Sequence, residues 1–323
     1  METSEKHYMF LLMQLLISCM LCFMAKVEAS KRNVSAFLVF GDSTVDPGNN
    51  NYIGTPFRSN FSPYGRDFAN KVPTGRFTNG KLATDFIASY IGVKELVPPY
   101  LDPKLSNEEL LTGVSFASAG SGFDPLTPSL TKVIPIQKQL EYFKEYKQRI
   151  EGLLGKQGTE EHIKKAAFLV SAEGARKIAV VGLPPMGCLP IMITLNSVNT
   201  FNHRGCIDKY SSVGRDYNLK LQNELHLIQL NNASNHGAKI YYFDIYQPLV
   251  DQIQDHERLG FKYVDCGCCG TGYIEASFLC NQYSPICLDS SEYIFFDSIH
   301  PTEKAYYDVF MNARPVIDSI IND

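Results

Sequence analysis

The sequence predicts an α/β fold in which a mainly parallel sheet carries helices on both faces. Short apolar runs typical of buried strands alternate along the chain with longer segments that are apolar on one side only. This alternation indicates parallel pairing, because each helix returns the chain to the start of the next strand. The sequence has no internal repeat and no linker-like tract, so we expect residues 30–323 to form a single domain.

The predicted strands are short apolar runs such as AFLVF and KIAVV, and they cover residues 36–40, 113–117, 166–171, 177–181, 239–245 and 293–296. The predicted helices have apolar residues at helical spacing, and they cover residues 81–91, 134–154, 208–230, 247–255 and 301–320. Pro301 begins the last helix, at a position where proline is well tolerated. A loop rich in Gly, Asn and Pro follows the first strand and extends from residue 46 to residue 80.

One interval does not fit this pattern. Only residues 172–176 separate the strand-like runs AAFLVS and KIAVV, whereas parallel neighbours need a crossover of about a dozen residues or more. Five residues can make a hairpin, but an antiparallel pair would then lie inside the sheet. The alternatives are that one run is not a strand, or that the two runs form one element.

The N-terminal segment Met1–Ala29 is predicted to be a secretory signal peptide. Lys6 and His7 give a modest positive region, and residues 9–24 are almost wholly apolar. Val27 and Ala29 put small residues at the −3 and −1 positions of a cleavage site. The alternative is a signal anchor, but the run is shorter than the roughly 20 residues that a membrane span needs. We therefore expect a secreted, extracellular chain with no stable membrane span after cleavage.

Sequons and cysteines agree with export. Three Asn-X-Ser sequons give candidate glycosylation sites at Asn33, Asn60 and Asn232. Seven cysteines follow the signal segment, and in an oxidising compartment most should be paired, with at least one left over because seven is odd. Proximity suggests the pairs Cys188–Cys206 and Cys280–Cys287. The run CGCC at residues 266–269 could instead bind a metal, but it lacks a second such motif or a nearby histidine, so we predict no metal site.

Composition limits the partners. The formal net charge is −4, and the sequence has no basic stripe and no arginine cluster, so no nucleic-acid partner is expected. The histidines at positions 162, 203, 226, 236 and 256 show no ligand spacing and are expected to be structural or exposed.

Two polar clusters at opposite ends of the chain carry the candidate chemistry. Ser43 follows the first predicted strand, and Asp297 and His300 follow the last one. Serine, histidine and a carboxylate can supply a nucleophile, a base and a group that orients the base. In parallel sheets such groups gather at the carboxyl ends of strands. The alternative is structural: Ser43 would be a turn residue, Asp297 or Ser298 would cap the last helix, and His300 would be solvated.

Other residues near these clusters have different predicted roles. Asp42 is expected to brace the turn that carries Ser43 rather than to orient the base, and Gly41 suits a sharp turn after a strand. The sequence contains no Gly-X-Ser-X-Gly elbow, which argues against a standard α/β-hydrolase.

Several segments together resemble a plant GDSL esterase/lipase of the SGNH hydrolase superfamily. They occur in the family's order and span nearly all of the chain after the signal segment: FGDSTVDPGNNN (40–51), PTGRFTNG (73–80), SFASAGSG (115–122), KIAVVGLPPMGC (177–188), CCGTG (268–272) and DSIHPTE (297–303). The resemblance implies a three-layer α/β/α sandwich with a flavodoxin-like sheet. It also implies hydrolysis of small-molecule or lipid esters without a metal or an organic cofactor.

The resemblance assigns roles to individual residues. It implies that Ser43 is the nucleophile, His300 the base and Asp297 its orienting partner. The family's oxyanion hole uses the backbone amide of the serine, a glycine of the second block and an asparagine of a third block. Gly120 is our choice for the glycine, with Gly122 as the alternative.

The third block is missing from this chain. In the family, a run like AAFLVS continues into Gly-X-Asn-Asp and a long helical stretch, but here it passes directly to residues 172–176. We therefore expect the fold to lack one crossover and the oxyanion hole to lack one donor. A skipped exon, an error in the gene model and a real deletion all predict this pattern. The alternative function is a catalytically impaired glycoprotein of the same family, and a further alternative is an incomplete product that folds poorly.

Overall fold

The computed structural model describes residues 34–122, 124, 126–169, 176–197, 204–232 and 237–322, and the structural statements below concern these residues. Residues Val34–Asp323 form one compact unit. The predicted signal peptide and Asn33 lie outside the described residues. In the described part, no helix combines the length and the apolar character needed to cross a membrane.

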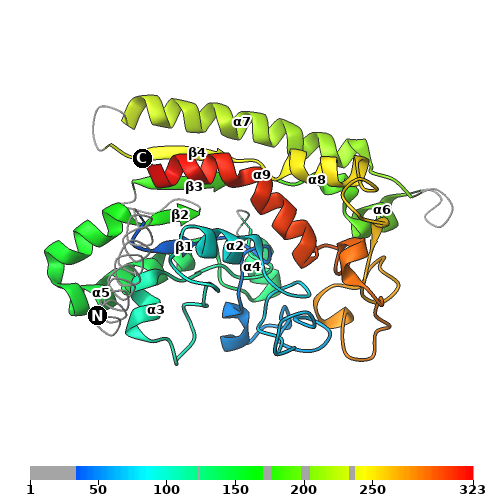
Figure 1. Cartoon of the computed structure of the whole chain (residues 1–323), viewed down its shortest axis with the longest axis horizontal. Coiled ribbons are helices and arrows are strands. Elements are labelled where there is room, and N and C mark those ends of the chain that lie inside the picture. The colour runs from blue at the N-terminus through cyan, green and yellow to red at the C-terminus, as the bar shows by residue number, and fades with distance from the viewer. Residues whose placement is uncertain are drawn as a thin grey trace, which may run out of the picture. The chain divides into compact units, whose positions relative to one another are not determined.

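The unit contains a parallel sheet of four strands in the order β1-β2-β3-β4 (Figure 1). The strands are Phe37–Val39 (β1), Ala167–Leu169 (β2), Lys177–Val181 (β3) and Lys239–Phe243 (β4). Ala167 lies opposite Phe37 on one side and Lys177 on the other, and every neighbouring pair is parallel. The prediction of a mainly parallel sheet is therefore confirmed.

The runs AAFLVS and KIAVV contribute two separate strands, β2 and β3, that pair in parallel. The hairpin, the single element and the alternative that one run is not a strand are therefore all wrong. Only residues 170–176 join these strands, and residues 170–175 are not among the described ones. This connection is much shorter than the crossover that parallel neighbours usually need, in agreement with the expectation that one crossover is missing.

Two other predicted strands differ from the prediction. Residues 113–117 run parallel to β1, and the amide of Phe116 donates to the Val39 carbonyl at 2.7 Å. Because only Ser115 makes bridge contacts, this segment is not a regular strand. The run at 293–296 gives β6 (Tyr293–Phe295), which pairs in parallel with an unpredicted strand, β5 (Tyr263–Gly267), in a separate small sheet.

The helices are of two kinds. The α-helices are Ala83–Tyr90 (α2), Asn107–Thr112 (α3), Leu126–Thr131 (α4), Ile136–Lys165 (α5), Pro190–Asn196 (α6), Asp208–Asn232 (α7), Tyr246–Gln254 (α8) and Glu303–Asn322 (α9). The 3-10 helices are Asn49–Tyr52 (η1), Met186–Cys188 (η2), Ser277–Leu279 (η3) and Ser290–Glu292 (η4).

Helices cover both faces of the sheet. Successive side chains of a strand point to opposite faces, so the apolar strands present apolar side chains on both faces, and each face packs against helices. On one face, Phe37 packs in a cluster with Ile87 of α2 and Phe310 of α9. On the other face, Leu38 packs in a cluster with Phe143 of α5. This arrangement is the three-layer α/β/α architecture that the resemblance implies (Figure 1).

Two helix boundaries differ from the predicted ones for local reasons. The predicted helix 134–154 stops where Gly155 adopts a φ of 71°, but the chain then resumes a helical path to Lys165. The last helix begins at Glu303 and not at Pro301. Thr302 precedes it, and the Thr302 hydroxyl accepts a hydrogen bond from the amide of Ala305 at 3.2 Å, as an N-cap residue does.

Three disulfides join cysteines of the predicted set. The pair Cys188–Cys206 is confirmed, but Cys280–Cys287 is wrong, because the structure pairs Cys268 with Cys287 and Cys269 with Cys280. Adjacent cysteines in an extended segment point in opposite directions, so Cys268 and Cys269 reach different partners. Their disulfides also contradict the metal-binding alternative. Cys266 is the free thiol that the odd count predicts.

Burial of the sheet decreases from one edge to the other. Every residue of β1 and β2 is buried, whereas β3 and β4 contain mostly half-buried residues. A fully covered parallel sheet buries all of its strands. The incomplete cover therefore lies on the two strands that follow the short connection.

A buried ion pair fixes α2 against the preceding loop. Arg76 and Asp85 are 4% and 0% exposed, and two guanidinium nitrogens contact the two carboxylate oxygens, each at 2.8 Å. Loss of one partner leaves a buried charge without its counter-ion, so Asp85→Ala is expected to lower the free energy of unfolding by about 3–5 kcal/mol in urea titrations. The control is Asp255→Ala, which removes the exposed Arg258–Asp255 pair and should cost less than about 1 kcal/mol. Equal losses in the two variants would contradict the prediction.

Candidate active site

The structure brings the two predicted polar clusters together. Ser43 lies in the loop after β1, and Asp297 and His300 lie in the loop after β6. The Ser43 Oγ is 2.8 Å from the His300 Nε2, and the His300 Nδ1 is 2.7 Å from the Asp297 Oδ2. Residues that are 257 positions apart in sequence thus form one hydrogen-bond chain.

The surroundings of His300 define its tautomer. Asp297 is 0% exposed and, as a carboxylate, only accepts hydrogen bonds, so the proton on the imidazole is on Nδ1. The Nε2 then has a free lone pair that accepts the Ser43 hydroxyl. The other carboxylate oxygen, Oδ1, also lies 2.9 Å from the Nδ1. It accepts from the amides of Ile299 and His300, both at 2.8 Å, which holds Asp297 in the turn.

Contacts of Gly41, two residues before Ser43, fix the turn that carries Ser43. Gly41 has a φ of 143°, and a side chain there would lie 2.9 Å from Val45. The side chain of Gln139, from α5 and 0% exposed, accepts from the Gly41 amide and donates to the Gly41 carbonyl, both at 2.9 Å. Asp42 accepts from the Thr44 amide at 2.9 Å, the bracing contact expected of it.

The loop with Gly120, our predicted oxyanion residue, is attached to the segment that follows Ser43. Gly120 has a φ of 83°, which favours glycine. The Asp46 carboxylate accepts from the Ala119 amide at 2.9 Å, and the Asn50 side chain donates to the Ala119 carbonyl at 2.9 Å. Burial raises the pKa of Asp46 to about 6, and the backbone amides that point at the carboxylate oppose this shift. The two hydrogen bonds of Ala119 join the loop that carries Gly120 to the segment that follows Ser43.

Sequence reasoning missed three buried polar residues around the site: Asp46, Tyr64 and Gln139. Asp46 lies inside the motif FGDSTVDPGNNN, and that position could have drawn attention to it. Tyr64 and Gln139 lie outside the motifs, and their positions in the sequence match no pattern of catalytic residues. Only their contacts in the folded structure identify them. Tyr64 donates to the Asp297 Oδ2 at 2.7 Å and is 1% exposed.

Of the three predicted glycosylation sites, Asn60 and Asn232 are among the described residues. Asn60 is exposed in the structure, as an acceptor must be. Asn232 is the last residue of α7, and the rest of its sequon lies outside the described residues, as does Asn33.

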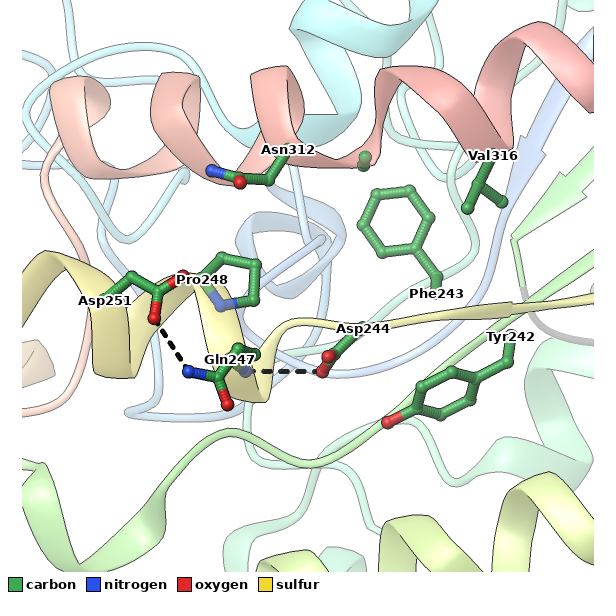
Figure 2. A pocket seen from close by; sticks show the side chains of 9 residues that line it. Tyr242, Phe243, Asp244, Gln247, Pro248, Asp251, Asn312 and Val316 are labelled. Carbon is green, nitrogen blue, oxygen red and sulfur yellow. Dashed lines mark hydrogen bonds between the residues drawn. The ribbon is translucent and has the colours of Figure 1, made fainter.

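A separate cavity of about 250 Å³ lies between the end of β4, α8 and α9 (Figure 2). Its polar side chains include Asp244, Gln247, Asp251 and Asn312, and none of the predicted site residues lines it. Gln247 donates to Asp251 at 2.7 Å, and Asp244 accepts the first amides of α8. Asp244, Gln247 and Asp251 thus make hydrogen bonds within α8 or at its start. The hydrogen-bond chain at Ser43 is therefore the better candidate site.

Comparison with known proteins identifies relatives along nearly the whole chain. A family model described as GDSL-like Lipase/Acylhydrolase matches residues 37–171 and 145–312. The protein GDSL esterase/lipase At5g45960 of Arabidopsis thaliana is 54% identical, covering 90% of this chain and 88% of the relative. GDSL esterase/lipase At2g40250, also of Arabidopsis thaliana, is 42% identical, covering 84% of this chain and 87% of the relative.

The same comparisons bear on the missing block. The alignment with the 54% identical relative extends over 332 positions, more than the 323 residues of the whole chain. The relative therefore has residues that this chain lacks. The first match to the family model ends at residue 171, which is where the sequence departs from the family pattern.

Proposed function

Because the chain belongs to the GDSL-like lipase/acylhydrolase family, we propose that it is a secreted serine ester hydrolase that works through an acyl-enzyme, with Ser43, His300 and Asp297 as its catalytic residues. The observation that carries the proposal is the 2.8 Å contact between the Ser43 Oγ and the His300 Nε2. A serine hydroxyl becomes an effective nucleophile only when a base can take its proton.

The proposed reaction begins when the Ser43 oxygen attacks the ester carbonyl and the His300 Nε2 takes the hydroxyl proton. Asp297 stabilises the imidazolium that forms, and His300 then gives the proton to the departing alcohol. Water, deprotonated by the same nitrogen, attacks the acyl-enzyme and releases the acid. Every proton transfer in this sequence uses the Nε2, whose orientation the Nδ1–Asp297 hydrogen bond sets.

The developing negative charge on the carbonyl oxygen needs hydrogen-bond donors. We assign two of them to the backbone amides of Ser43 and Gly120. The third donor of the family, an asparagine of the Gly-X-Asn-Asp block, has no counterpart here. Loss of one such donor lowers the rate by about 10²–10³-fold. We therefore expect this chain to be a slow esterase.

The test is covalent labelling with a fluorophosphonate, which reacts with activated serines. We expect mass spectrometry to find the label on Ser43 and p-nitrophenyl acetate and butyrate to be hydrolysed. The control variant Ser43→Ala should show neither result. Equal rates of hydrolysis for the wild type and Ser43→Ala would remove the proposal.

A second candidate function is a secreted glycoprotein of the same family that has lost most of its activity. The absent Gly-X-Asn-Asp block is the observation that favours it. A cooperative unfolding transition would first verify that the protein is folded. If that folded protein neither binds the fluorophosphonate nor hydrolyses the esters, this candidate is favoured over the esterase.

A further inference from the structure

Tyr64 lies at the end of the hydrogen-bond chain that joins Ser43, His300 and Asp297. Its hydroxyl donates to the Asp297 Oδ2 at 2.7 Å, the same oxygen that contacts the His300 Nδ1 at 2.7 Å. We propose that Tyr64 is a positioning residue that orients Asp297 and limits the negative charge that His300 experiences. This inference rests on the proposed function, because it deepens the role of the same site.

The direction of the Tyr64 hydroxyl proton follows from its two partners. The backbone amide of Ser277 donates to the Tyr64 oxygen at 2.8 Å, so this contact uses a lone pair of the phenol. The single hydroxyl proton is then left for Asp297, which can only accept. Burial, followed by the charge of Asp297, raises the pKa of Tyr64 well above its usual value of 10, so the phenol keeps its proton.

A cysteine-bridged segment holds the Ser277 amide in place. Ser277 lies between Cys269 and Cys280, which form a disulfide. It adopts a φ of 52°, which is uncommon outside glycine. Its hydroxyl donates to the Arg58 carbonyl at 3.1 Å. The segment closed by the Cys269–Cys280 disulfide is therefore linked to Asp297 by two hydrogen bonds, one from the Ser277 amide to Tyr64 and one from Tyr64 to the carboxylate.

Aromatic packing fixes the ring of Tyr64. Phe61, Phe77 and Phe296 surround it in edge-to-face contacts, with centroid distances of 5.8, 5.7 and 5.5 Å. Phe77 also lies against the imidazole of His300 at 4.9 Å. A ring held in this way keeps its hydroxyl at one position relative to Asp297.

Other ionisable groups near Asp297 come from three further segments. Tyr306 of α9 is buried, and its pKa is well above 10, first through burial and then through the charges of Asp42 and Asp297. Asp42 comes from the Ser43 turn. The Glu275 carboxylate accepts from Thr271 of its own loop. The Tyr306 hydroxyl has no hydrogen-bond partner among the described residues, whereas the Tyr64 hydroxyl donates directly to the Asp297 carboxylate.

The test compares two replacements at position 64 that act in opposite directions. Tyr64→Phe removes the donor, so Asp297 keeps more negative charge and stabilises the imidazolium better; the acid limb of the kcat/KM profile should move to higher pH. The same replacement removes the contact that orients Asp297. For that reason we expect kcat to fall about 10-fold, with KM nearly unchanged. Site-specific 3-fluorotyrosine at position 64 is a stronger donor in a nearly identical shape, so it should move the limb to lower pH.

Tyr146→Phe is the matched control. Tyr146 is 0% exposed and donates to the Leu110 carbonyl at 2.9 Å, so its loss removes a buried tyrosine hydrogen bond outside the site. It should lower stability without moving the pH profile. If neither variant at position 64 moves the profile, or if Tyr146→Phe moves it equally, the inference is wrong.

A readout that does not depend on turnover separates this inference from the proposed function. The proton shared by the His300 Nδ1 and Asp297 should give a downfield NMR signal, and both variants at position 64 should move that signal, in opposite directions. An inactive wild type would remove the proposed function, and the inference would then stand or fall on this signal. An active wild type with an unmoved signal would overturn the inference alone.

Discussion

Insertion of a crossover segment between β2 and β3 is expected to raise kcat for short esters by about 10²–10³-fold. The inserted segment would contain Gly-X-Asn-Asp followed by a helical stretch, in the family's pattern, and would lie between Leu169 and Lys177. The resemblance places the asparagine donor of the oxyanion hole in this segment, directly after the strand that corresponds to β2. A single donor aimed at the oxyanion is worth about 3–4 kcal/mol in the transition state, which gives the expected gain.

The same insertion is expected to raise the thermal unfolding temperature. A parallel sheet is stable when helices cover both faces, and β3 and β4 are the strands with half-buried residues. Differential scanning calorimetry measures this effect separately from the rate.

A matched insertion separates the two effects. When the asparagine of its Gly-X-Asn-Asp is replaced by alanine, the insertion should keep the gain in thermal stability but lose the gain in kcat. Equal gains in kcat from both insertions would show that order in the sheet, and not the donor, limits the rate. No gain from either would contradict the prediction.

The sequence predicted the sheet well, because buried parallel strands are continuous apolar runs that need little context to recognise. The strand KIAVV has the bounds expected for it, 177–181. The strand β5 was missed because its sequence, YVDCG, mixes polar residues with a cysteine. Its neighbours and the adjacent disulfides stabilise it, and such long-range contacts leave no periodic pattern.

The site shows the same division between local and long-range information. Ser43, Asp297 and His300 could be named from short motifs, because nucleophile, base and carboxylate are recognisable residue types. The supporting residues Tyr64 and Gln139 could not be named, since each acts through a contact with a distant segment. The disulfide pairing failed for a related reason: proximity in sequence favoured Cys280–Cys287, whereas the fold pairs both residues with the adjacent cysteines at positions 268 and 269.

Ser43→Ala, His300→Ala and the double variant are all expected to reduce kcat by the same amount, about 10⁴–10⁶-fold. The reason is that the two side chains perform one step. Without the imidazole the hydroxyl keeps its proton, and without the hydroxyl the imidazole has no proton to remove, so the second replacement has nothing further to lose. The measurement is hydrolysis of p-nitrophenyl butyrate, made on the protein with the inserted crossover if that insertion raises kcat as expected.

Two further variants control for the chemistry of the replaced side chains. His256 contacts the Phe261 carbonyl in its own turn at 3.1 Å, and the Ser212 hydroxyl donates to the Lys209 carbonyl on α7 at 3.0 Å. His256→Ala and Ser212→Ala should therefore leave kcat within about 2-fold of the starting value, as expected for substitutions away from a site. If the losses from Ser43→Ala and His300→Ala instead multiply in the double variant, the two residues act independently, and the proton transfer between them is not the step that activates the serine.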